Sequence, residues 1–193
     1  MPYGWINKAP IREVDSGEVS GIATTLRQQI AAWGKGSENW DPARRHHINK
    51  TGADGLLENL EIMGGEQLNY VYEYGGLVLG LLAVNIIPDY VKVEDLLAHP
   101  GTEGGGATLL EFAVTLSQQH GCHGKLTLYA LNQNASDFYL KMGFVRSEPA
   151  DPASGGGNMT LDPATRNDIW QQGSEGQWMV KTYIGKKFAG ETG

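Results

Sequence analysis

Three consecutive glycines stand between an apolar strand pattern and an amphipathic helix pattern. The stretch HPGTEGGGATLLE spans residues 99–111, and its glycines are Gly104, Gly105 and Gly106. Glycine lets the backbone bend sharply or approach a ligand closely, and the start of a helix presents unpaired N–H groups to an anion. This junction therefore predicts a phosphate-binding loop, and the residues around it decide which phosphate is bound.

The sequence on either side of the glycines has regular structure. YVKVEDLLA, residues 90–98, predicts a strand, and ATLLEFAVTLSQQHG, residues 107–121, predicts a helix that Gly121 ends. Before them, Asp15 and Glu18 predict the cap of a helix whose inward face carries Val19, Ile22, Leu26 and Ile30. Further predicted elements are strands at 11–14, 67–74, 77–87, 125–131, 144–148 and 177–183, helices at 51–62 and 135–143, and loops at 34–50 and 149–176.

This order of elements indicates an α/β fold of the α+β kind. Gly75 and Gly76 separate two strand-like runs and predict a tight hairpin. A strand meander followed by alternating helices and strands predicts a mixed, mostly antiparallel central sheet with helices on both faces. A chain of 193 residues is long enough for one well-packed domain, so we expect a single domain over residues 1–193.

Composition excludes several classes of function. The net charge of -7 at pH 7 argues against sequence-independent nucleic-acid binding and favours a cationic substrate such as an amine. The longest apolar run, residues 77–87, is too short to cross a bilayer. Cys122 is the single cysteine, so a reducing compartment is the simpler assumption, and we expect a cytoplasmic protein with no membrane contact.

Two common phosphate loops do not fit the glycines. A P-loop needs Lys and Ser or Thr after its last glycine, but Ala107 and Thr108 follow here. A dinucleotide fingerprint needs glycines in the order Gly-x-Gly-x-x-Gly, which GTEGGG does not offer. Another kind of diphosphate loop is therefore needed.

Two separate motifs resemble the GNAT superfamily of acyl-CoA N-acyltransferases. Aligned on Leu-Leu-Glu at residues 109–111, Gly104 and Gly106 fall on the two glycines of that family's pyrophosphate loop. Downstream, NQNASDFYLKMGF at residues 132–144 is similar to the family's later motif, with Asn, Ala, Tyr and Gly-Phe at matching intervals. The resemblance implies the GNAT fold and acetyl-CoA as cosubstrate, without a metal.

The resemblance also implies where coenzyme A binds. The usual Gln or Arg of the loop falls on Gly101, so backbone N–H groups are expected to hold the diphosphate, with acidic Glu103 nearby. The end of the preceding strand is expected to pair with pantetheine and to polarise the acetyl carbonyl, and Asn132 matches a position near the pantetheine arm. The implied cofactor-binding residues are Leu96, Leu97, Ala98, Gly104, Gly105, Gly106, Ala107, Thr108 and Asn132.

Proton transfer completes the implied chemistry, in which acetyl moves to a primary amine by direct attack in a ternary complex. Tyr139 matches the family tyrosine that supplies a proton to the leaving thiolate. Glu94 and Asp95 are the carboxylates available to the attacking amine. Neighbours on a strand point to opposite faces, so at most one of them faces the cleft. We prefer Glu94, and a base acting through water is an equal alternative.

Other functions are compatible with the sequence. The chain could be a non-catalytic acyl-CoA-binding or regulatory module, or a toxin-type acetyltransferase acting on aminoacyl-tRNA through a patch at Arg44, Arg45 and Lys50. The histidines at residues 46 and 47 have no third ligand at suitable spacing, so no zinc site is expected. In this family the connection around Trp40 commonly borders the acceptor site. The expected partner is a small-molecule or peptide amine, and a homodimer is left open.

Overall fold

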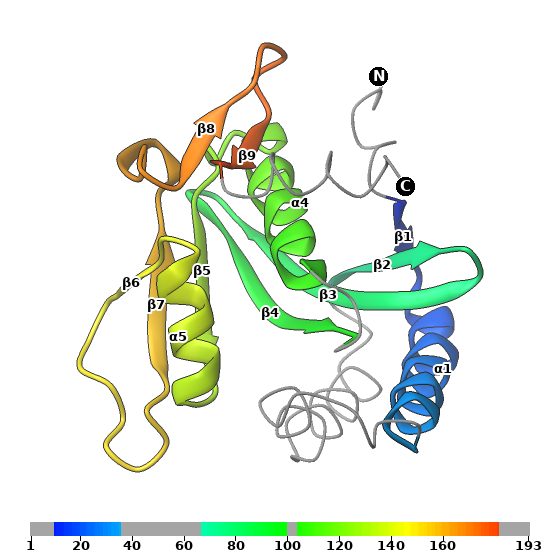
Figure 1. Cartoon of the computed structure of the whole chain (residues 1–193). Coiled ribbons are helices and arrows are strands. Elements are labelled where there is room, and N and C mark those ends of the chain that lie inside the picture. The colour runs from blue at the N-terminus through cyan, green and yellow to red at the C-terminus, as the bar shows by residue number, and fades with distance from the viewer. Residues whose placement is uncertain (1–9, 36–66, 100–103, 182–193) are drawn as a thin grey trace, which may run out of the picture. The chain divides into compact units, whose positions relative to one another are not determined.

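The computed structural model describes residues 10–35, 67–99 and 104–181 (Figure 1). Its main sheet has seven strands in the order β1-β2-β3-β4-β5-β7-β6. These strands are β1 (Ile11–Val14), β2 (Leu68–Tyr74), β3 (Leu77–Ile87), β4 (Tyr90–Ala98), β5 (Leu126–Ala130), β6 (Val145–Arg146) and β7 (Gly157–Leu161). The α-helices of the described residues are α1 (Ser16–Lys35), α4 (Gly105–Gln119) and α5 (Gln133–Lys141).

The strand pairing confirms the predicted sheet type. β1 with β2, β2 with β3, β5 with β7 and β6 with β7 are antiparallel, whereas β4 with β5 is parallel. The parallel pair is connected through α4, which is the crossover that parallel neighbours require. The sheet is therefore mixed and mostly antiparallel.

The chain divides into two compact units. The first is Met1–Val84 with Asp95–Leu109, and the second is Asn85–Glu94 with Leu110–Gly193. The boundaries fall inside β3, β4 and α4, so these three elements contribute to both units. The single domain over residues 1–193 stays a prediction, and each unit is described by itself.

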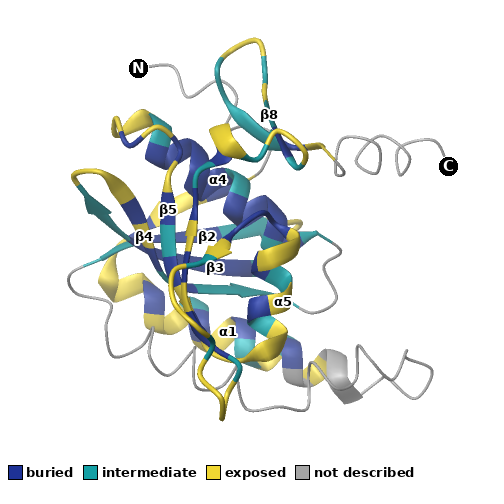
Figure 2. Ribbon diagram, turned by 90° about the vertical axis from the view of Figure 1, so that its left-hand side faces the viewer, coloured by how far each residue is buried: buried dark blue, intermediate teal, exposed yellow. Residues whose placement is uncertain are grey.

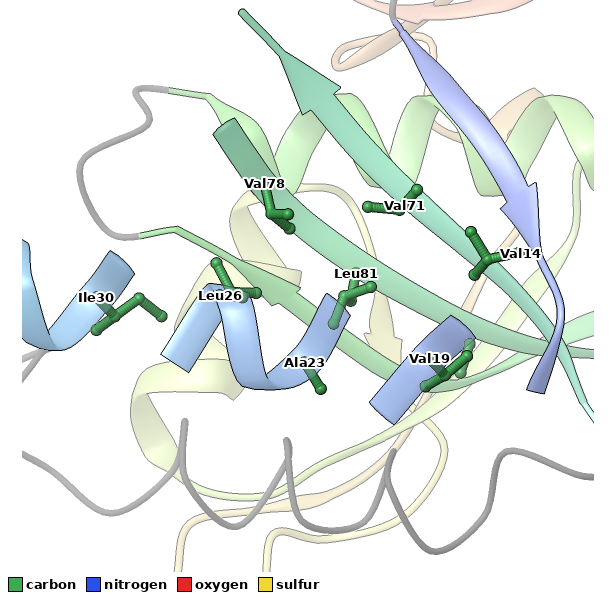
Figure 3. Packing of buried hydrophobic residues seen from close by; sticks show 9 residues of the cluster. Val14, Val19, Ala23, Leu26, Ile30, Val71, Val78 and Leu81 are labelled. Atoms are coloured by element: carbon green, nitrogen blue, oxygen red, sulfur yellow. The ribbon is translucent and has the colours of Figure 1, made fainter. Parts of the chain in front are cut away.

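In the first unit, α1 begins with the predicted cap and buries one face. The backbone N–H of Glu18 donates to Oδ1 of Asp15 (2.9 Å), and the N–H of Asp15 donates to Oε2 of Glu18 (3.4 Å). Figure 3 shows apolar side chains of the helix pointing toward those of the strands. This core comprises Val14, Val19, Ala23, Leu26, Ile30, Val71, Val78, Leu81 and Ala83, with Ile22 packed against it. The predicted inward face of the helix is confirmed.

The predicted hairpin between β2 and β3 is also confirmed. Gly75 and Gly76 have φ values of 59° and 79°, the left-handed conformation that two-residue hairpin turns favour. The register shifts beside Tyr72, where Gly80 and then Val78 stand opposite consecutive β2 residues. Leu79 is thus the extra residue of a bulge, which leaves Val78 and Leu81 on the α1 face.

Gly80 lies on the opposite face of β3 and makes room for the start of α4. A Cβ at Gly80 would lie 2.7 Å from the carbonyl oxygen of Leu97 and 2.8 Å from Cδ1 of Leu109. Because neighbouring strand residues face opposite sides, α1 and the first turns of α4 cover different faces of this part of the sheet. Helices on both faces are therefore confirmed within the first unit.

The close approach at Gly80 gives a stability prediction. Gly80→Ala is expected to destabilise the protein by about 1–3 kcal/mol, since a backbone oxygen cannot move aside as a flexible side chain can. Urea unfolding followed by circular dichroism measures the change. The matched control is Gly21→Ala on the exposed side of α1, where a Cβ would meet nothing within 4 Å. The control is expected to stabilise by about 0.5–1 kcal/mol, and equal effects of the two changes would contradict the close approach.

In the second unit, burial alternates along the strands and α5 packs alongside β5 (Figures 1 and 2). Leu126, Leu128 and Ala130 of β5 are buried, opposite Leu161, Met159 and Gly157 of β7. At the other end of α4, Gly121 has a φ of 80°, and the N–H of Cys122 donates to the carbonyl of Ser117 (2.9 Å). The predicted glycine end of this helix is confirmed.

The predicted loop at residues 149–176 is wrong in its main part. It contains β7, the 3-10 helix η2 (Pro163–Thr165) and β8 (Trp170–Gln172). β7 starts directly after Gly155 and Gly156. Glycines are typical of loops, so the strand that follows them was not predicted. A Cβ at Gly156 would lie 2.3 Å from the carbonyl oxygen of Ala130, so this glycine permits a close backbone approach.

The last predicted strand also differs from expectation. It is shortened to β9 (Trp178–Val180) and pairs antiparallel with β8 in a separate two-stranded sheet. It therefore does not extend the central sheet. Several predictions lie outside the described residues: the rest of the 34–50 loop beyond α1, the helix at 51–62, Trp40, Arg44–His47, and the loop positions Gly101 and Glu103.

Candidate functional site

The predicted diphosphate loop forms the start of α4 in the first unit. Gly104 has a φ of 79°, and its carbonyl accepts the N–H of Thr108 (2.9 Å). Gly105, Gly106, Ala107 and Thr108 make the first turn of the helix, which contains no acidic side chain. The first N–H groups of a helix have no partner within it and carry partial positive charge. The five predicted loop residues thus come together at one anion-attracting helix end.

The strand end that precedes this loop belongs to the same unit. Leu96, Leu97 and Ala98 are half-buried residues of β4, and the N–H of His99 donates to the carbonyl of Leu79 (2.8 Å). Burial lowers the pKa of the His99 imidazole, against a smaller opposing effect of a hydrogen bond to the Gln29 backbone. The register that pairs β4 with β5 covers Val91–Val93, so the three residues lie beyond it. Pantetheine pairing by their backbone stays a prediction.

Gly80 is a site-supporting residue that the sequence reading missed. It admits both the Leu97 carbonyl and the Leu109 side chain, one from each flank of the predicted loop. The available signal was a lone glycine inside the apolar run LVLGLLAV, which often marks a close backbone approach.

In the second unit, the preferred base Glu94 is held by two neighbours. Asn85 Nδ2 donates to its Oε1 (2.7 Å), and Lys92 Nζ lies 2.8 Å from its Oε2. The Glu94 side chain is 15% exposed, so these partners act in a partly desolvated place. Asp95, its strand neighbour, is buried and points to the other face. Asn85 of β3 was missed because a cross-strand partner depends on register, whereas Lys92 lies two residues before Glu94 on β4 itself. The role of Glu94 as a base stays a prediction.

The second motif folds as α5 and the turn after it. Asn132 caps the helix, and its Oδ1 accepts the N–H of Ala135 (3.0 Å). Gly143 has a φ of 93° and returns the chain, so that the N–H of Phe144 donates to the carbonyl of Tyr139 (3.0 Å). The spacing of Asn, Tyr and Gly-Phe therefore has a structural reason in the cap, the body and the end of one short helix.

Tyr139 is buried at 8% exposure in an aromatic group. Its ring centroid lies 5.2 Å from that of Phe138 and 5.3 Å from that of Phe144, both in tilted geometry. Such packing fixes the direction of the ring. Asn132 and Tyr139 stand two turns apart and so share one side of α5. Their roles toward coenzyme A stay predictions.

Two further observations bear on metal and membrane. Within residues 10–35, 67–99 and 104–181, no cluster of three or more His, Cys, Asp or Glu side chains is placed to hold a metal ion. Burial raises the pKa of the Cys122 thiol, with a smaller effect of Asp89, and its Sγ donates to the Ile87 carbonyl (3.4 Å). Cys122 is thus a buried free cysteine. None of the described helices has the length and apolar character needed to cross a membrane.

The fold defined by this sheet and by the glycine-led start of α4 is that of the GNAT superfamily. The PaiA N-acetyltransferase from Thermoplasma acidophilum, solved with coenzyme A, has a similar structure with a TM-score of 0.50 and 20% sequence identity. The similarity covers 78% of this chain and 96% of that chain. At this identity it establishes the fold alone.

The chain belongs to the family of nodulation outer protein P, whose family model matches residues 88–187. That range begins before β4 and ends after β9, so it includes both GNAT motifs. No curated protein sequence matches the chain. A GCN5-related N-acetyltransferase from Rhodopseudomonas palustris is also similar in structure, with a TM-score of 0.47 and 20% identity over 79% of this chain and 94% of that chain.

Proposed function

We propose that the chain is an N-acetyltransferase that moves acetyl from acetyl-CoA to a primary amine by direct attack in a ternary complex. The observation that carries this proposal is the first turn of α4, where Gly105–Ala107 present backbone N–H groups and no side chain is acidic. This helix is the next described element after β4 in a GNAT fold, and the similar PaiA protein was solved with coenzyme A. Acetyl-CoA supplies the activated acyl group.

The residues of this chain divide the remaining work. N–H groups of the α4 start bind the diphosphate, and the backbone of Leu96–Ala98 orients the pantetheine arm and polarises the thioester carbonyl. The amine nitrogen forms the new bond to the carbonyl carbon as the carbon–sulfur bond breaks. Tyr139 gives its phenol proton to the departing sulfur.

The amine proton leaves through Glu94 or through water. Since both carboxylate oxygens of Glu94 have partners in Asn85 and Lys92, water is the better-supported acceptor of the two. The same observation favours a second candidate function, a non-catalytic acyl-CoA-binding module. The net charge of -7 supports a cationic small-molecule or peptide acceptor. A cytoplasmic location and a homodimer stay predictions.

Calorimetry with acetyl-CoA, followed by thiol release with a panel of primary amines, tests the proposal. Binding together with amine-dependent thiol release is the expected result. Binding without release on any amine would favour the module. No heat of binding at millimolar acetyl-CoA would contradict both functions, because each requires the same loop.

A further inference from the structure

The β8–β9 hairpin, drawn in orange to red in Figure 1, forms a two-stranded sheet of its own and is hydrogen-bonded to the end of α5. Trp170 of β8 has no exposed surface, and its Nε1–H donates to the carbonyl of Met142 (2.8 Å). Arg166, just before β8, donates from Nη1 to the carbonyl of Gly143 (2.9 Å). The last carbonyls of a helix lack partners within it, so these two donors satisfy groups that would otherwise need water.

The packing around this turn is tight. A Cβ at Gly143 would lie 3.3 Å from Cδ1 of Ile169 and 3.4 Å from Nε1 of Trp170. The hairpin therefore closes on the same glycine whose positive φ ends α5. The turn has little freedom to shift while the hairpin is in place.

This turn is linked directly to Tyr139. Phe144 is 1% exposed, donates its N–H to the Tyr139 carbonyl and packs its ring 5.3 Å from the Tyr139 ring. A movement of Gly143 would carry Phe144 with it and so change the position of the tyrosine ring. Trp170 is thus connected, through the turn at Gly143 and through Phe144, to the residue proposed to protonate the leaving thiolate.

Hydrogen bonds also fix the second strand of the hairpin, β9. The N–H of Val180 in β9 donates to Oε1 of Glu111 on α4 (2.9 Å), and the N–H of Lys181 donates to the carbonyl of Ile169 (2.8 Å). Glu111 is the glutamate of the Leu-Leu-Glu stretch that follows the glycines. The hairpin therefore connects Glu111 of α4 to the end of α5 within the second unit.

We propose that Trp170 is a positioning residue that holds the end of α5, and through Phe144 the ring of Tyr139, in the geometry needed for proton transfer. The catalytic part of this inference rests on the proposed acetyltransferase function. Its structural part does not, because the position of Tyr139 can be measured without turnover.

The decisive comparison is between two tryptophans of one hairpin. Trp170→Phe removes the hydrogen bond to Met142 and keeps an aromatic ring. Trp178→Phe is the matched control, since Trp178 Nε1 is buried without a hydrogen-bond partner among the described residues. Protein labelled with ¹³Cζ-tyrosine reports the Tyr139 ring, and Tyr139→Phe assigns its resonance among the eight tyrosines.

We expect Trp170→Phe to move the Tyr139 resonance and to speed hydrogen exchange of the Phe144 amide, while Trp178→Phe leaves both as in the wild type. If the wild type acetylates amines, Trp170→Phe should lower kcat about threefold to tenfold, the range of one lost hydrogen bond, with KM for acetyl-CoA unchanged. An unmoved Tyr139 resonance with unchanged Phe144 exchange overturns the proposal. A moved resonance in a protein without turnover keeps the positioning role and contradicts only the proposed function.

A second pair of variants tests the same proposal if the Trp170→Phe protein does not fold. Arg166→Met removes the bond to the Gly143 carbonyl, and Asp168→Asn weakens only the ion pair that the same guanidinium makes (3.1 Å). The first is expected to move the Tyr139 resonance and the second is not. Equal spectra for both variants and the wild type overturn the proposal in the same way.

Discussion

Tyr139→Phe is expected to lower kcat for amine acetylation about a hundredfold or more, a common contribution of general acid catalysis. The ring of Tyr139 packs between Phe138 and Phe144, and phenylalanine keeps those contacts. Folding and acetyl-CoA affinity should therefore change little, and the loss should be found in the chemical step. Single-turnover thiol release at saturating acetyl-CoA measures it.

Tyr129→Phe is the control for that change. Tyr129 lies on β5 in the same unit, is 50% exposed and makes no predicted contact with coenzyme A. Its loss of a hydroxyl should leave kcat within about twofold, as expected of a surface substitution. Equal rates for Tyr139→Phe and the wild type would assign Tyr139 to the aromatic core and would remove it from the mechanism.

Gly106→Asp is expected to weaken acetyl-CoA binding about tenfold to a hundredfold while leaving the protein as stable as before or slightly more stable. Gly106 is half-buried in the first turn of α4, so a short side chain can reach solvent there. A carboxylate in a first helical turn stabilises the helix by about 0.3–1 kcal/mol but repels a diphosphate bound to the same N–H groups. The acetyl-CoA affinity measured by calorimetry should therefore fall, while the Tm measured by thermal unfolding should stay the same or rise slightly.

Gly21→Asp makes the same change of residue and charge elsewhere. Gly21 lies on the exposed side of α1, where a Cβ would meet nothing within 4 Å. Acetyl-CoA affinity should be unaffected there, so the control separates a local effect at α4 from a general increase in negative charge. Full affinity in Gly106→Asp would place the diphosphate away from the α4 start.

The features that the sequence predicted well depend on residues close together in the chain. The cap of α1 needs Asp15 and Glu18, and the hairpin turn needs Gly75 and Gly76. The start of α4 follows from glycines next to an amphipathic run. Each of these is determined within a few residues, where hydrophobic periodicity and backbone preferences act directly.

The features that the sequence did not predict depend on long-range pairing. Asn85 reaches Glu94 from the neighbouring strand β3, and the contact of Trp170 with Met142 joins residues 28 positions apart. The sequence predicted a loop at β7 because Gly155 and Gly156 stand before it, although the absence of a side chain at Gly156 is what allows the approach to Ala130. Local propensity cannot predict a close contact between two segments that are far apart in the sequence.

The position of β7 has a consequence for how the chain reaches its fold. β7 is inserted between β5 and β6, although it follows both in the sequence. During synthesis β5 therefore has an unoccupied hydrogen-bonding edge on this side until Gly157–Leu161 have left the ribosome. A strand edge of that kind can pair with another chain. Completion of this sheet is thus a late event in biogenesis, and a chain cut short before residue 157 would leave β5 open to aggregation.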